Sequence, residues 1–237
     1  NMPQKGIIRL QKNGEVFASV NKSDGVYQPV FANKGLAGAV YEITAAEDIY
    51  TLDGTLRASK GEVVDTVTTG TDGTAKSKEL YLGKYEVKEI TAPYGMVLND
   101  EIHAVELTYA GQEIEITETE TDFYNERQKA AIHLRKMMEQ DARFGIGQEN
   151  EILSVQFGLF AAEDLTAADG AVIPADSLLE IVSCDENGNA AFQTDIPAGA
   201  KLYVQELATD ERYILSEEKY PVVFDYAGQD TALVEIK

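Results

Sequence analysis

The sequence predicts an all-β protein built of two tandem antiparallel β-sandwich domains. Apolar and polar residues alternate with a period of two in many short segments, which is typical of strands with one buried face. Asp-Gly and Asn-Gly pairs, which favour tight hairpin turns, occur at 53–54, 72–73 and 187–188. Long amphipathic helical patterns are absent, and the chain repeats itself once. These observations together favour a small sandwich in each half.

The internal repeat has a period of about one domain. Tyr-Ala-Gly-Gln at Tyr109 recurs at Tyr226, an offset of 117 residues, and 83–89 aligns with 200–206 at the same offset. Residues 8–12 align with 132–136 at an offset of 124, and such drift is expected from loop insertions. The predicted domains are therefore 1–128 and 129–237.

The first repeat contains six segments with the strand pattern. Each alternates apolar and polar side chains and is bounded by turn residues. The expected strands cover 6–12, 39–44, 62–68, 84–90, 103–108 and 113–117.

Composition argues against several classes of function. The 237 residues include 20 Lys and Arg against 41 Asp and Glu, a net charge of −21 that argues against nucleic acid and anionic membranes as partners. A hydrophobic content of 44% is enough for packed cores. The single cysteine, Cys184, excludes an internal disulfide. No apolar run approaches the roughly 20 residues of a membrane span.

Two charged residues of the first repeat lie in phase with its core. Glu89 shares a strand face with Tyr85 and Val87, and Lys12 shares one with Leu10. Lysine and glutamate are rarely fully buried unless they are paired, because an isolated buried charge is very costly. The pattern predicts a shared polar site inside the domain.

The second repeat places Lys136 and Glu206 at the matching positions. Alternatively, all four residues lie at strand ends, where their side chains reach water or form salt bridges at the rim of the sandwich. The duplication of the same in-phase pair favours the buried site.

A longer motif gives the first repeat a family resemblance. Residues 70–91 combine an Asp-Gly turn, Leu-x-x-Gly-x-Tyr and a glutamate four residues after that tyrosine, and Ala-Pro-Tyr-Gly follows at 92–95. This resembles the Cna B-type or SpaA-type prealbumin-like repeats of Gram-positive pilins and surface adhesins. The second repeat matches more weakly, since it lacks the Ala-Pro-x-Gly loop. The resemblance implies that both domains are prealbumin-like (Ig-like, transthyretin-like) sandwiches.

The resemblance also implies an intramolecular isopeptide bond in the first domain. Lys12 and Asn125 match the two joined residues, and Glu89 matches the catalyst. Asn125 is in phase with Phe123, which agrees with an inward side chain. Burial would favour the free amine of the lysine and a protonated glutamate that donates to the Asn125 carbonyl oxygen.

The second domain is expected to lack this bond. The acceptor Asn125 lies 16 residues after Tyr109. The position 16 residues after Tyr226 would be 242, which is beyond the last residue of the sequence, Lys237. We therefore expect that the last strand is missing and that Lys136 and Glu206 have no acceptor. Lys136 should pair electrostatically with Glu206 or turn towards solvent; a cut chain and a donor strand from elsewhere both account for the gap.

The expected function is structural. By resemblance, the chain is a pilin subunit or adhesin stalk, extracellular and attached to the cell wall through regions outside this chain, with other pilin or surface-protein subunits as partners. Alternatively, it is an adhesin domain that contacts a host matrix protein or glycan. An enzyme is disfavoured, because no nucleophile elbow, phosphate loop or metal motif occurs, and we expect no cofactor or metal.

Overall fold

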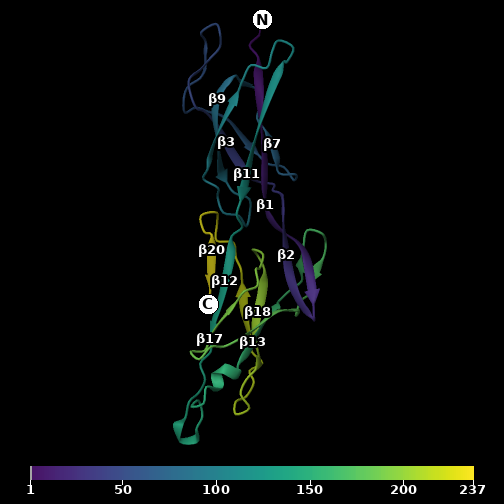
Figure 1. Ribbon diagram of the computed structural model, residues 1–237, viewed down its shortest axis with the longest axis vertical. Coiled ribbons are helices and arrows are strands. Elements are labelled where there is room, and N and C mark those ends of the chain that lie inside the picture. Colours follow the sequence, from purple (N-terminus) through teal and green to yellow (C-terminus); the bar gives the residue numbers. More distant parts are fainter. Residues whose placement is uncertain (1) are drawn as a thin grey trace. The chain divides into compact units, whose positions relative to one another are not determined.

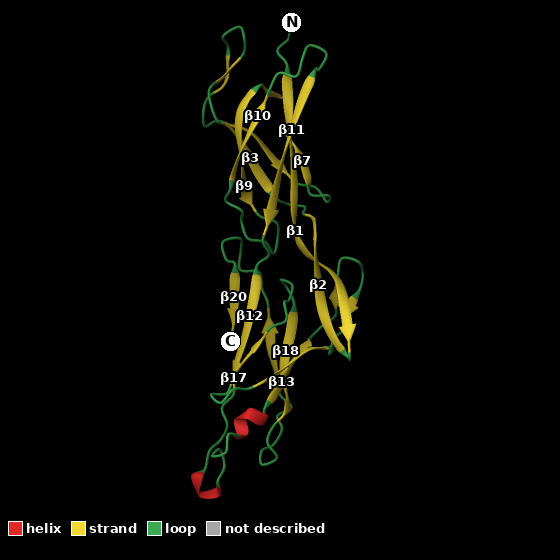
Figure 2. Ribbon diagram, viewed as in Figure 1, coloured by secondary structure: helices red, strands yellow, loops and turns green. Residues whose placement is uncertain are grey.

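Strands make up most of the protein, as Figure 2 shows in yellow. The computed structural model describes residues 2–237. Its helical segments are two short 3-10 turns, η1 (Ala142–Phe144) and η2 (Glu151–Ser154). The prediction of an all-β fold is confirmed.

The chain divides into two compact units whose segments interleave. The first unit comprises residues 1–15, 33–127 and 228–230, and the second comprises 16–32, 128–227 and 231–237. The predicted limit at 128/129 therefore describes the main part of each unit but not the exchanged segments, 16–32 and 228–230. The period of the repeat does not indicate that a segment of one repeat packs in the unit formed mainly by the other.

Two sheets form the first unit. One places β1 (Lys5–Ser23) between the parallel strand β11 (Ile116–Asn125) and the short antiparallel strands β7 (Thr74–Lys76) and β8 (Leu80–Tyr81) (Figure 1). The other has the order β10-β9-β3-β6, formed by Ile102–Leu107, Gly83–Thr91, Val40–Ala45 and Val63–Thr68. A side hairpin pairs β4 (Ile49–Tyr50) with β5 (Leu56–Ala58).

The core of the first unit is built from the inward faces of both sheets. Ile8 and Leu10 of β1 pack with Tyr41 of β3, Val87 of β9 and Phe123 of β11, all buried. The alternating burial along β9 agrees with the predicted inward face. The sandwich therefore directs every second residue of β1, β9 and β11 into one apolar interior.

The second unit repeats this order of strands. One sheet is β17-β12-β20, formed by Asn189–Phe192, Lys129–Arg135 and Leu233–Ile236, with β20 parallel to β12. The other is β16-β13-β18-β19, formed by Leu178–Ser183, Gln156–Ala161, Lys201–Ala208 and Lys219–Val223. A side hairpin pairs β14 (Leu165–Thr166) with β15 (Val172–Ile173). Each strand order matches that of the first unit, as expected of a repeat.

The hairpin of residues 16–32 completes the second unit. It is formed by the end of β1 and most of β2 (Val26–Gly35). Phe17, Val20 and Tyr27 pack against the core of that unit. The carbonyl of Phe17 accepts the Ala168 N–H at 2.9 Å, and the Gln28 amide donates to the Leu179 carbonyl at 2.8 Å. The predicted strand 6–12 therefore covers only the first part of β1.

Two expectations about last strands need correction. In the first unit the segment 113–117 is mostly a loop, and strand β11 begins at Ile116 and continues to Asn125. In the second unit a last strand is present, because β20 starts opposite Lys129 just as β11 starts opposite Lys5. The expectation for the second unit rested on the position of the acceptor, which does not specify where the strand begins.

Candidate functional site

The polar cluster of the first unit is set by strand register. Across the parallel pair of β1 and β11, Lys12 lies opposite Phe123 and Gly14 lies opposite Asn125. Across β9 and β3, Glu89 lies opposite Tyr41. The site therefore draws its side chains from both sheets of the sandwich.

A tight turn fixes the backbone at Lys12. The Lys12 N–H donates to the Gly73 carbonyl at 2.7 Å. Gly73 has a φ of +81°, and a Cβ there would lie 2.3 Å from the Lys12 carbonyl oxygen. Only glycine fits this approach, which explains the Asp-Gly pair in the sequence. In the second unit Gly188 makes the same contact with the backbone of Lys136.

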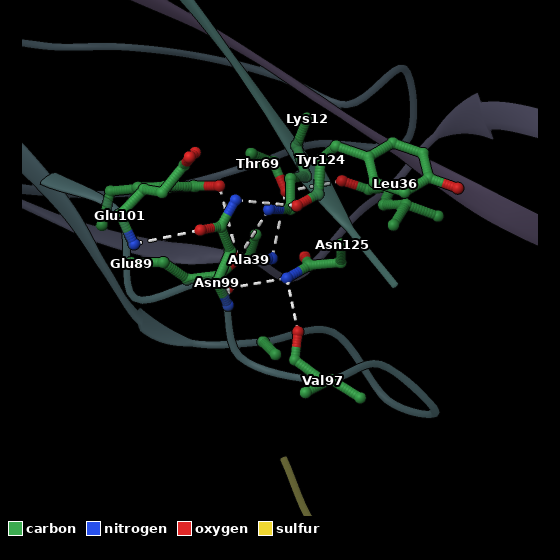
Figure 3. Close-up of polar contacts among 12 residues, drawn as sticks. Lys12, Leu36, Ala39, Thr69, Glu89, Val97, Asn99, Glu101, Tyr124 and Asn125 are labelled. Carbon is green, nitrogen blue, oxygen red and sulfur yellow. Dashed lines mark hydrogen bonds and ion pairs between the residues drawn. The ribbon is translucent and has the colours of Figure 1, made fainter. Parts of the chain in front are cut away.

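The three predicted site residues of the first unit lie together and are fully buried. Lys12, Glu89 and Asn125 each have 0% of their surface exposed. The Lys12 ammonium nitrogen lies 3.0 Å from Oε2 of Glu89, as an ion pair whose angles do not meet those of a hydrogen bond. The Asn125 amide nitrogen donates to Oε1 of Glu89 at 2.8 Å and to the Val97 carbonyl at 2.8 Å (Figure 3).

The environment of this cluster favours a neutral amine. Burial lowers the pKa of Lys12, although the contacts with Glu89 act in the opposite direction. Like the Glu89 contacts, the rings of Tyr41 and Phe123 attract the charged form, since their centroids lie 5.6 and 5.7 Å from the ammonium nitrogen. An amine that loses its proton inside such a pocket is a nucleophile.

The Asn125 carbonyl differs from the sequence-based expectation. Its Oδ1 atom is buried and has no hydrogen-bond partner, whereas the amide nitrogen faces Glu89. A buried polar atom without a partner costs about 1–3 kcal/mol. The carboxyl group of Glu89 is thus placed beside the nitrogen that would leave, rather than beside the carbonyl oxygen.

Sequence reasoning missed two further contacts of Glu89. The Asn99 backbone N–H donates to Oε1 at 2.9 Å, and the Tyr41 hydroxyl donates to Oε2 at 3.3 Å. Tyr41 is in phase with Ile43 and with the core, so the alternation of strand 39–44 could have placed it inside. The Asn99 contact comes from a loop backbone and carries no side-chain signal.

The second unit holds a more open version of the same pair. The Lys136 ammonium lies 3.0 Å from Oε1 of Glu206, and the lysine side chain is 27% exposed while that of Glu206 is 1% exposed. Oε2 of Glu206 accepts the Ser216 N–H at 2.8 Å. Phe157 lies opposite Glu206 in the register, where the first unit has Tyr41. In the register, the position that Asn125 occupies on β11 has no counterpart on β20, which ends at Ile236.

The remaining described residues offer no metal centre. In residues 2–237, no group of three or more His, Cys, Asp or Glu side chains is arranged to hold a metal ion. No helix in this range is long and apolar enough to cross a membrane.

Part of the chain matches the model of a known protein family. Residues 30–122 match the model of the SpaA prealbumin-like fold domain. This stretch of the chain is similar to a SpaA-type prealbumin-like domain. The matched range includes Glu89 but ends before Asn125, and it begins after Lys12.

One solved structure shares its fold with nearly the whole of this chain. The Bacillus anthracis TIE protein aligns over 99% of this chain and 34% of its own, with 20% identity and a TM-score of 0.60, which shows a shared fold. A streptococcal ancillary pilin aligns over 99% of this chain and 62% of its own at 16% identity, with a TM-score of 0.34. The shaft pilin SpaA of Lactobacillus rhamnosus GG aligns over 99% and 98% at 12% identity, with a TM-score of 0.33.

This chain spans about a third of the length of the B. anthracis protein and less than two thirds of the ancillary pilin. Among curated proteins, no significant match was found.

Proposed function

We propose that the chain is a structural segment of a Gram-positive cell-surface protein, a pilin subunit or adhesin stalk, strengthened by an isopeptide bond between Lys12 and Asn125. The observation that carries this proposal is the burial of Lys12, Glu89 and Asn125 together in one apolar core. The match of residues 30–122 to the SpaA domain supports it. Other surface subunits are the partners that such a segment would contact.

The chemistry needs no group from outside the site. Glu89 takes a proton from the Lys12 ammonium, and the free amine attacks the Asn125 side-chain carbonyl carbon. The protonated Glu89 then returns the proton to the leaving nitrogen, which lies 2.8 Å from its Oε1. A C–N bond forms, the former amide C–N bond breaks and ammonia departs, while Glu89 takes up the last proton from the new amide nitrogen. No oxidant is required, and the reaction happens once per molecule.

Folding supplies the driving conditions for this step. The two reactive groups come from β1 and β11, which the sandwich holds side by side, and such fixed proximity is equivalent to a very high effective concentration. The reaction also replaces a buried ion pair, which is costly to desolvate, with a neutral amide. The loss of ammonia to solvent makes the bond permanent.

The purified chain is expected to weigh one ammonia less than its sequence requires. Intact-mass spectrometry measures this difference, and peptide mapping should find one branched peptide that joins the segments around Lys12 and Asn125. Lys136 should be recovered in unmodified peptides, because β20 ends before the register position that Asn125 occupies on β11. The full sequence mass would overturn the cross-link, and the loss of two ammonia molecules would show that the second unit also reacts.

Replacing Glu89 with glutamine should leave most of the chain at its full mass. The amide cannot take the Lys12 proton, and general acid–base groups of this kind contribute about 10²–10⁴-fold in rate. The matched control is Glu206→Gln, which changes the equivalent buried residue of the second unit. That control should lose one ammonia as the parent chain does. Complete ammonia loss in Glu89→Gln would contradict the role of Glu89.

A further inference from the structure

Tyr41 contacts the site from the second sheet and is fully buried. Its hydroxyl donates to Oε2 of Glu89 at 3.3 Å, and this is the oxygen that lies 3.0 Å from the Lys12 ammonium. Its ring lies 5.6 Å from the same ammonium and packs on Phe123 with centroids 4.6 Å apart. One side chain therefore touches both the proposed base and the proposed nucleophile.

We propose that Tyr41 is a positioning residue for the cross-linking reaction, holding Oε2 of Glu89 directed at Lys12. This inference rests on the proposed Lys12–Asn125 bond. A carboxylate on a flexible side chain can rotate, and donors on both oxygens restrict it. Oε1 is held by the N–H groups of Asn99 and Asn125, so the Tyr41 hydroxyl supplies the donor for the other oxygen.

The hydroxyl remains a donor over the whole working range of pH. Burial raises the pKa of Tyr41 well above its usual value, and the nearby Glu89 carboxylate raises it further. The titratable side chains that contact Glu89 are Lys12 from β1 and Tyr41 from β3. Asn99 and Asn125 contribute uncharged N–H groups. Within this set, only Lys12 and Glu89 exchange the reactive proton.

The second unit shows the arrangement without this hydroxyl. Phe157 takes the place of Tyr41 opposite Glu206. Oε1 of Glu206 is buried, has no hydrogen-bond partner and lies beside a lysine that is partly exposed. The tyrosine hydroxyl is therefore present beside the fully buried Lys12–Glu89 pair, which also contacts Asn125. It is absent beside the partly exposed Lys136–Glu206 pair.

Before the reaction the Lys12 ammonium lies 3.0 Å from Oε2 of Glu89. Glu89 must take a proton from it before the amine can attack. Rotation of the carboxylate would carry Oε2 away from the ammonium. Without the hydroxyl, folded molecules should therefore react more slowly.

The test follows the reaction during refolding of the full chain. Protein isolated unfolded from inclusion bodies is diluted out of denaturant, and both the intact mass and the fraction of folded protein are recorded over time. Tyr41→Phe removes the hydroxyl and keeps the ring. The control is Tyr85→Phe, which removes another buried tyrosine hydroxyl of the same unit, one that donates to the Tyr81 carbonyl and not to Glu89.

Tyr41→Phe is expected to lose ammonia about tenfold more slowly than the parent chain, because Oε2 of Glu89 loses the donor that directs it at Lys12. Tyr85→Phe should keep the rate of the parent. A purely structural role for Tyr41 would slow the reaction only as far as the variant is less folded, whereas a positioning role slows it in fully folded protein.

The outcomes separate the two proposals. If the parent chain keeps its full mass, the isopeptide bond itself is refuted. If the parent reacts and folded Tyr41→Phe reacts at the same rate as the folded parent, Tyr41 has no positioning role. Folding of each variant is checked by thermal unfolding. A variant that does not fold is refolded with trimethylamine N-oxide, which favours the compact state, and measured beside the parent under that condition.

Discussion

Replacing Lys12 with alanine is expected to remove the isopeptide bond and to lower the free energy of unfolding of the first unit by about 4–5 kcal/mol. The bond would close a loop from residue 12 to residue 125, and a cross-link over about 100 residues contributes this amount on the chain-entropy model. The melting temperature of that unit should fall by about 15–20 °C. Denaturant unfolding and calorimetry of the same samples measure both quantities.

A second variant separates the bond from the ion pair. Lys12→Ala also leaves Glu89 buried without its partner, which adds a cost of its own. Asn125→Ala removes the bond but keeps the Lys12–Glu89 pair. The loss of stability that both variants share measures the cross-link. Unchanged melting temperatures in both would show that no covalent tie was present, whatever the arrangement of the side chains.

Replacing Phe17 with alanine is expected to destabilise the second unit by about 2–3 kcal/mol, somewhat below the usual cost of truncating a fully buried phenylalanine. Phe17 is partly buried and packs on the core of that unit, although it lies in the sequence of the first repeat. Hydrogen exchange of the backbone amides in β13 and β18 measures the effect. Loss of ammonia should be unaffected, because Lys12, Glu89 and Asn125 all belong to the first unit.

The control for this variant is Val30→Ala, on the other strand of the same hairpin. Val30 is 39% exposed, so its truncation removes little buried surface. Amides of the second unit should therefore exchange as in the parent chain. Equal exchange in Phe17→Ala and Val30→Ala would mean that the hairpin does not support that core.

Much of the site could be predicted because side-chain direction in a strand has a period of two. That rule placed Lys12, Glu89 and Asn125 on inward faces, and all three are buried. The cost of an unpaired buried charge then required that the lysine and the glutamate meet. The roles of the three residues in a cross-link stay a prediction.

The sequence by itself determined the all-β class, the repeat and the inward face of each main strand, since these depend on local alternation and on turn residues. Only the tertiary structure decided that residues 16–32 pack in the second unit, that Tyr41 lies on Glu89, and that β20 pairs with β12. Alternation assigns a side chain to a face of its own strand. It does not specify which strand from elsewhere in the chain lies opposite that face, because this depends on burial and hydrogen bonding summed over segments far apart in sequence.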